Sequence, residues 1–262
     1  MNNYLYHFFP RKFESEDKTV SVLESIIRNG LFLSKEILSV NWKDVYAIRG
    51  IQRKLEAEQF RFCLTAITNK TELKTHSSIF GSIGLEFQED TIVKMGGFPV
   101  FYVPTPQFEN ACNEEYKGVS LLYRLADAQQ VLDYVIKNDV IQTKDIDLIN
   151  VLGAIKFLAN ICYPTQRKRN FDSAEINYYN QREWRIIHNL TSENVKIGKH
   201  QNCYTVVAFN NEPIRNFITR IIVFESENIS KGTSQSIYYK IGELINYFKM
   251  DCKLEYFNTT EP

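Results

Sequence analysis

One short segment, Arg182-Glu183-Trp184-Arg185, constrains the fold of this chain more than any other. It runs into Ile186-Ile187, and an apolar run of this kind is typical of a strand that enters a core. In a strand, Glu183 and Arg185 share one face while Trp184 takes the other. A carboxylate at such a position is costly to bury unless it is paired. The segment therefore predicts either an ion pair that holds a strand edge, with Trp184 in the core, or a carboxylate that takes part in function.

The composition is that of a soluble globular protein: 262 residues, of which 44% are hydrophobic and 24% are charged. The 31 basic and 31 acidic residues cancel, so no global charge attracts nucleic acid or an anionic membrane. The five cysteines are scattered without a CxxC pair, which disfavours a disulfide framework and a metal site. We see no signal peptide and no apolar run of the roughly 18 residues that a membrane span needs. We therefore expect a cytoplasmic protein without a membrane anchor.

Short apolar runs predict a chain rich in strands, with candidates near both ends. They cover residues 5–9, 61–67, 83–87, 99–103, 184–188, 203–209, 219–224 and 253–257. We expect the runs 83–87 and 99–103 to pair, because a connection containing Gly96-Gly97 separates them. Residues 75–81, which include His76, are expected to form a turn.

Helical spacing appears near both ends and in the middle of the chain. Val22, Leu23, Ile26 and Ile27 predict a first helix that stops at Asn29-Gly30, and residues 237–248 predict a last one. Two amphipathic stripes, 121–135 and 148–162, predict a helical insert over residues 114–163. The simplest fold class is α+β, a single domain over residues 1–262 with one mixed or antiparallel sheet and this insert.

Two histidines and a basic loop are further candidates for a site. His7 shares a strand face with Leu5 and Phe9, where it is either a core residue or a catalyst. His76 lies among hydroxyl side chains, where it belongs either to a site loop or to the surface. The loop 165–170, with Tyr178 and Tyr179 downstream, either binds phosphates beside a stacked base or is simply solvated. The motifs of P-loop ATPases, common dinucleotide dehydrogenases, zincins and α/β-hydrolases are absent from the sequence.

Several segments, taken in order, resemble the bacterial AbiGi-type abortive-infection proteins. The arginine-glutamate-tryptophan-arginine segment is the most specific of them; the others are residues 6–9, 23–30, 62–65, 76–85 and 99–103. The resemblance covers most of the chain outside the predicted insert. It implies a role in phage defence, either as a protein that halts the growth of an infected cell or as the antitoxin-like partner of such a protein.

A looser resemblance links the chain to ADP-ribosyltransferases, including those of the DarT toxin type. It implies an ADP-ribosyltransferase-like fold and NAD as a substrate. By this resemblance His7 would hold the NAD ribose, Thr65 would contact the nicotinamide side, and Glu183 would stabilise an oxocarbenium-like transition state. The residues expected around the NAD molecule are Arg11, His76, Tyr179, Arg182 and Arg185. The acceptor of the ADP-ribose would be a nucleic acid or a protein.

The sequence leaves three functional hypotheses open. The first is a defence effector that uses NAD and a macromolecular acceptor. The second is a non-catalytic antitoxin or sensor module that binds a nucleotide, RNA or a partner protein through Arg182, Arg185 and the basic loop. The third, ranked last, is a metal-free RNA nuclease that uses His7, His76 and Glu183. NAD turnover, or its absence, separates the first hypothesis from the other two.

Overall fold

The structure is a computed structural model of the 262-residue chain. It describes residues 3–42, 53–103, 162–164, 166–168, 175–177, 182–200, 203–225 and 229–258, together with Asn138 and Leu158. The chain divides into two compact units. Unit 1 comprises Met1–Lys35, Phe60–Phe98 and Arg182–Pro262, and unit 2 comprises Glu36–Gln59 and Pro99–Gln181. The site residues discussed below lie in unit 1, except Tyr179.

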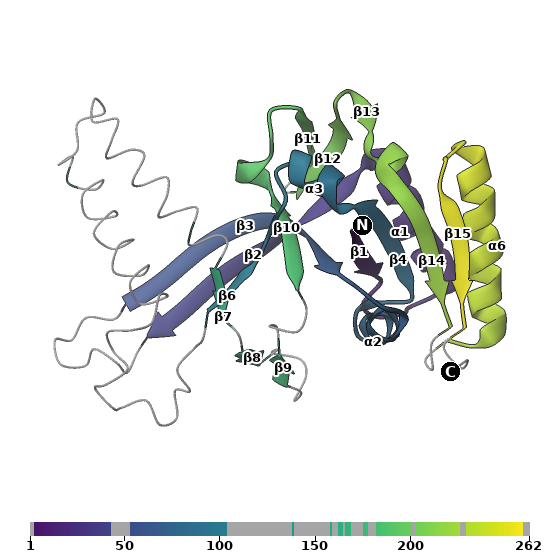
Figure 1. Cartoon of the computed structure of the whole chain (residues 1–262), viewed down its shortest axis with the longest axis horizontal. Coiled ribbons are helices and arrows are strands. Elements are labelled where there is room, and N and C mark those ends of the chain that lie inside the picture. Colours follow the sequence, from purple (N-terminus) through teal and green to yellow (C-terminus); the bar gives the residue numbers. More distant parts are fainter. Residues whose placement is uncertain are drawn as a thin grey trace. The chain divides into compact units, whose positions relative to one another are not determined.

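One large mixed sheet dominates the described structure (Figure 1). Its main path runs in the order β11-β12-β2-β3-β1-β4-β14-β15, and β10 adds to it beside β3. The pair β14–β15 is parallel, whereas β1 pairs with β3 and β4 in the antiparallel sense. The strands of this path are β1 (Tyr4–Phe9), β2 (Leu31–Trp42), β3 (Arg53–Ala66), β4 (Ile83–Gln88), β11 (Val195–His200), β12 (Cys203–Phe209), β14 (Ile218–Phe224) and β15 (Lys253–Phe257). Three further strands join it: β5 (Phe98–Pro99), β10 (Glu183–Ile187) and β13 (Glu212–Pro213). The predicted mixed sheet is confirmed.

Few helices accompany this sheet in the described ranges. They are α1 (Glu16–Asn29), α2 (Lys70–Phe80), α3 (Glu89–Lys94) and α6 (Lys231–Tyr247), with 3₁₀ turns η4 (His188–Leu190) and η5 (Ile214–Phe217). The predicted first helix is confirmed as α1. The Ser15 hydroxyl accepts a hydrogen bond from the Lys18 N–H at 3.2 Å, and Gly30 ends the helix at φ 98°.

The two faces of the sheet in unit 1 pack against different helices. Strand residues such as Leu5, Leu85 and Ile221 form one core with the buried sides of α1 and α6. Tyr6, Phe8, Ile222 and Phe224 form a second cluster with Leu73 of α2. Neighbouring residues of β1 therefore face different helices, because successive side chains of a strand alternate between its faces. This alternation fixes which site residues can meet.

Besides residues 36–42 of β2 and 53–59 of β3, the described residues of unit 2 form two small strand pairs. β6 (Phe101–Val103) lies parallel to β7 (Cys162–Pro164), and β8 (Gln166–Lys168) lies antiparallel to β9 (Glu175–Asn177). The predicted insert 114–163 falls outside the described residues except at Asn138, Leu158 and 162–163. The second predicted helical stripe extended to Cys162. Its end is wrong, because Cys162 lies in strand β7 and pairs with Phe101 of β6. Arg167 and Lys168, predicted in a loop, lie in β8.

Two further local expectations are corrected by the structure. The predicted turn around His76 is the helix α2, which begins where the Asn69 side chain accepts a hydrogen bond from the Glu72 N–H at 2.9 Å. The predicted pairing of 83–87 with 99–103 is wrong. β4 is flanked by β1 and β14, while β5 pairs with β10 and β6 pairs with β7. The physical reason is that β1 and β14 already occupy the two edges of β4.

Candidate functional site

The register of β10 on β3 brings Thr65 and Glu183 directly opposite each other. Glu183 faces Thr65 and Arg185 faces Cys63, two residues further along the antiparallel pair. Residues at these alternate positions share one face of the sheet. We call this group the β3–β10 site; it consists of Arg61, Cys63, Thr65, Glu183 and Arg185.

A buried ion pair dominates the β3–β10 site. Arg185 donates from Nε to Glu183 Oε1 at 2.8 Å and from Nη2 to Oε2 at 3.2 Å. Arg61 Nη1 lies 4.0 Å from the same Oε1. Burial alone would raise the pKa of Glu183, but the two guanidinium groups, with Arg185 foremost, outweigh it and hold the pKa below its ordinary value. The predicted Glu183–Arg185 pair is confirmed, and Trp184 packs against the core on the other face.

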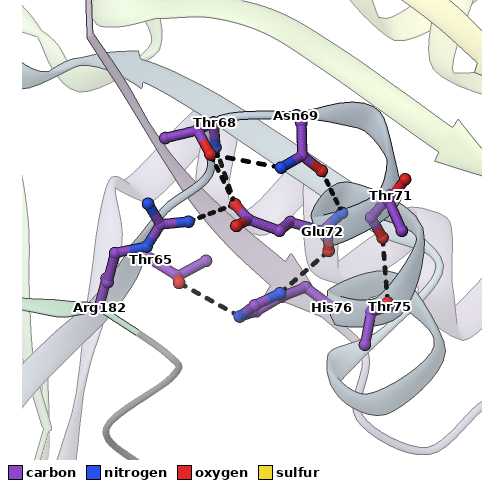
Figure 2. Close-up of polar contacts among 8 residues, drawn as sticks. All are labelled: Thr65, Thr68, Asn69, Thr71, Glu72, Thr75, His76 and Arg182. Atoms are coloured by element: carbon purple, nitrogen blue, oxygen red, sulfur yellow. Dashed lines mark hydrogen bonds and ion pairs between the residues drawn. The ribbon is translucent and has the colours of Figure 1, made fainter.

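The first turns of α2 bring a second set of polar residues to Thr65 (Figure 2). The Glu72 carbonyl only accepts, so His76 Nδ1 carries the proton that it donates there at 3.0 Å. The unprotonated Nε2 of His76 then accepts from the Thr65 hydroxyl at 3.4 Å. Burial lowers the pKa of His76, which keeps the imidazole neutral. This geometry pairs a hydroxyl with a potential base.

Arg182 connects β10 to the start of α2. Its guanidinium forms an ion pair with Glu72, and the Glu72 carboxylate also accepts from the Thr68 N–H at 2.9 Å. The Arg182 carbonyl accepts a hydrogen bond from Ala66 N–H at 3.1 Å. Arg182 has φ 43°, a left-handed conformation that is uncommon for an arginine. Glu72 was not a candidate in the sequence, although the spacing Asn69-x-x-Glu72 is that of a helix-capping box.

His7 lies on the opposite face of the sheet from the β3–β10 site. Tyr6, and not His7, is the residue of β1 that faces Thr65. His7 Nδ1 donates to the Cys63 carbonyl at 2.8 Å, and its ring lies 4.1 Å from that of Phe62. The structure thus brings Thr65 and Glu183 together on one face of the sheet and places His7 on the other face.

The position of His7 predicts a pH-dependent stability. Burial lowers the pKa of His7 from 6.5 to about 4, so the unfolded chain binds a proton there more readily than the folded one. Stability from this residue is therefore complete above pH 6.5 and is lost as the pH falls toward 4. We expect a loss of about 1 to 3 kcal/mol across this window, measured by urea unfolding, beyond the loss seen in His7→Phe. Equal pH profiles for the two proteins would contradict this placement of His7.

The remaining residues that were predicted to surround NAD are spread over several places. Arg11 lies 5.7 Å from the ring centroid of Phe80, whose ring also stacks on His76 at 5.8 Å. Arg185 is fully buried behind Glu183. Tyr179 lies outside the described residues. His76 and Arg182 are therefore the two of this set that meet beside Thr65.

A second polar cluster, which the sequence did not suggest, lies further along the same face. Arg220 donates from Nε to Glu86 Oε2 at 2.9 Å and from Nη1 to Glu255 Oε2 at 2.6 Å. Tyr6 donates its hydroxyl to Glu86 at 2.7 Å. These bonds join β1, β4, β14 and β15, so the cluster fixes the register of four strands.

The chain matches the family described as abortive phage resistance protein AbiGi, antitoxin, over residues 54–230. This match covers more than half of the 262 residues. The chain belongs to the AbiGi family. The resemblance seen in the sequence is therefore confirmed, and it places the protein in abortive phage resistance. Comparisons with curated proteins and with solved structures gave no match.

The part of the chain that matches the AbiGi family contains the β3–β10 site and α2. It also contains Glu86 and Arg220 of the second cluster, whereas β1 with His7, α1 and α6 lie outside it. None of the helices in the described ranges is long and apolar enough to span a membrane. The described residues hold no group of three or more His, Cys, Asp or Glu side chains arranged to bind a metal ion.

Proposed function

We propose that this AbiGi-family protein is the antitoxin component of a phage-defence pair and acts by binding a partner protein. The family description supplies the antitoxin role. In this proposal the partner is a toxin that arrests the growth of the infected cell, and the chain holds it inactive until infection. The β3–β10 site then stabilises the fold that presents the binding surface.

One observation carries the non-catalytic part of this proposal: the carboxylate of Glu183 is already engaged. Arg185 binds both of its oxygens, at 2.8 and 3.2 Å, and the Arg185 side chain is fully buried. A carboxylate that must stabilise a developing cation is most effective when its charge is not cancelled by a neighbour. His7, another of the three expected catalytic residues, lies on the opposite face.

Copurification tests the proposed function. The tagged chain is expressed together with the untagged product of the gene next to its own, and the purified material is passed over a gel-filtration column. We expect the two proteins to elute as one complex and the complex to survive moderate salt. Separate elution of the two folded proteins would contradict the antitoxin proposal.

The ADP-ribosyltransferase-like hypothesis is the second candidate, and one observation favours it. Thr65 and Glu183 face each other across two strands, with His76 Nε2 on the Thr65 hydroxyl. In this reading Glu183 stabilises the cation that forms when nicotinamide leaves NAD, and a nucleic acid or protein accepts the ADP-ribose.

Release of nicotinamide separates the two candidates. The protein is incubated with NAD, alone and with lysate or nucleic acid, beside its Glu183→Gln variant, whose folding is verified by circular dichroism. We expect no release above background from either protein. Release by the wild type, lost in the folded variant, would establish NAD chemistry at Glu183 and overturn the non-catalytic proposal.

A further inference from the structure

The outer side of α6 carries an unusual pair of exposed aromatic residues. Tyr239 and Tyr247 are 71% and 70% exposed, more than any other exposed large hydrophobic residue among those described. They lie eight positions apart with Glu243 between them, so all three follow one stripe of the helix. The opposite side of α6, with Ile237, Ile241 and Ile245, packs into the core beside β15 (Figure 1).

The ring of Tyr247 is held in place by a neighbouring cation. The Arg28 guanidinium lies 5.7 Å from the centroid of this ring and 4.8 Å from that of Phe248. Tyrosine and arginine are the residues most often found at the energetic centre of protein interfaces. A ring that is already held loses less entropy when a partner binds. The stripe therefore has the residue types of a protein-binding surface, and one of its rings is already held in a fixed position.

The charges around this stripe differ between its two ends. Near Tyr239, the carboxylates of Glu16 and Asp17 share the single ammonium group of Lys240, at 2.6 and 2.8 Å. Near Tyr247, Arg28 is paired with Glu24, while Arg215 and Lys249 have no carboxylate partner among the described residues. Among the groups just named, the carboxylates outnumber the cation at the Tyr239 end, and the cations outnumber the carboxylate at the Tyr247 end.

We propose that a second copy of this chain binds here, with the two α6 helices antiparallel about a two-fold axis near Glu243. We call the stripe and its two charged ends the α6 surface; it consists of Asp17, Arg28, Tyr239, Glu243, Tyr247 and Lys249. In this arrangement Tyr239 of each copy packs on Tyr247 of the other, and the acidic end faces the basic end. A two-fold interface requires such self-complementarity, because the same patch serves both copies. The proposal goes beyond the antitoxin function and does not depend on it.

The two-fold axis also predicts a charge penalty. Glu243 would lie next to Glu243 of the second copy, and two like charges oppose association. Neutralising Glu243 should therefore strengthen the dimer. This effect is not expected if the chain is monomeric or if it dimerises through another surface. Glu243 is exposed, so the substitution leaves the core untouched.

Sedimentation velocity of the purified chain, without any partner, tests this inference. We expect a dimer whose population rises with concentration between about 1 and 100 µM. Tyr247→Ala and Tyr239→Ala should each raise the dimer Kd by about tenfold or more, and Lys249→Glu should also raise it. Glu243→Gln should lower the Kd by about threefold. Val93→Ala, a 48% exposed residue of α3, serves as the matched control and should change nothing.

Two results would overturn the inference. The first is a wild-type chain that stays monomeric over the whole concentration range. The second is a dimer whose Kd is unaffected by both tyrosine substitutions, or is raised by Glu243→Gln, because the interface would then lie elsewhere. Neither result bears on copurification with a toxin, so failure of this inference leaves the proposed function standing.

Discussion

Replacing Arg185 by methionine is expected to lower the free energy of unfolding by about 3 to 5 kcal/mol. Arg185 is the largest of the fully buried side chains, and it binds both oxygens of Glu183. Without it, Glu183, a residue of which only 8% is exposed, loses its bidentate partner, while the more distant Arg61 stays at 4.0 Å. The desolvation of the remaining charge is then uncompensated. Urea unfolding followed by circular dichroism measures the change.

The matched control removes both charges at once. The double variant Glu183→Leu with Arg185→Met leaves no unpaired charge, and we expect it to lose less than half of the stability that Arg185→Met loses. If Arg185→Met unfolds at the same urea concentration as the wild type, solvent must reach the Glu183 carboxylate. In that case the β3–β10 site would be open to a ligand, and the non-catalytic proposal would lose its main support.

Replacing Gly30 by alanine is expected to cost about 2 to 4 kcal/mol. Gly30 ends α1 at φ 98°, a conformation that alanine adopts only with strain. An added Cβ would also lie 2.0 Å from the carbonyl oxygen of Val206, so β12 would have to move. Because α1 and β2 meet at this residue, the shift would spread into both. Thermal unfolding of the variant measures the loss.

A second glycine in the same protein gives the control. Gly242 lies within α6, and a Cβ added there would meet Leu254 Cδ2 at 3.6 Å, an ordinary contact. Gly242→Ala is expected to stabilise the protein by about 0.5 to 1 kcal/mol, because alanine favours the helix. The two substitutions should thus have opposite signs. A loss of stability in both, or in neither, would contradict the described approach of α1 to β12.

Local patterns in the sequence predicted much of the sheet. The alternation around Glu183 predicted its pairing with Arg185, and Asn29-Gly30 predicted where α1 ends. These features depend on residues close in the chain. β2 was missed because Lys35-Glu36 interrupts its apolar alternation, and β11 was missed because Lys196 and Lys199 give it a polar sequence. α2 was missed because only Leu73 and Ser77 are buried in it.

The candidate site depends on pairings that no local pattern contains. The sequence placed His7 correctly on the face of Leu5 and Phe9, but the register of β1 on β3 decides that this face is not the one of Thr65. The register of β10 on β3 likewise decides that Glu183 faces Thr65. Both registers join segments more than fifty residues apart, so the expected grouping of His7, Thr65 and Glu183 could not be checked from the sequence.

Bacterial growth tests the central claim, that this AbiGi-family chain neutralises a partner rather than poisoning the cell itself. The chain, the product of the adjacent gene, and both together are expressed in separate cultures, and growth is followed by optical density. The account predicts normal growth with the chain alone, arrest with the adjacent product alone, and restored growth with both. Arrest by the chain alone, relieved by Glu183→Gln, would contradict it and would assign the toxic activity to the β3–β10 site.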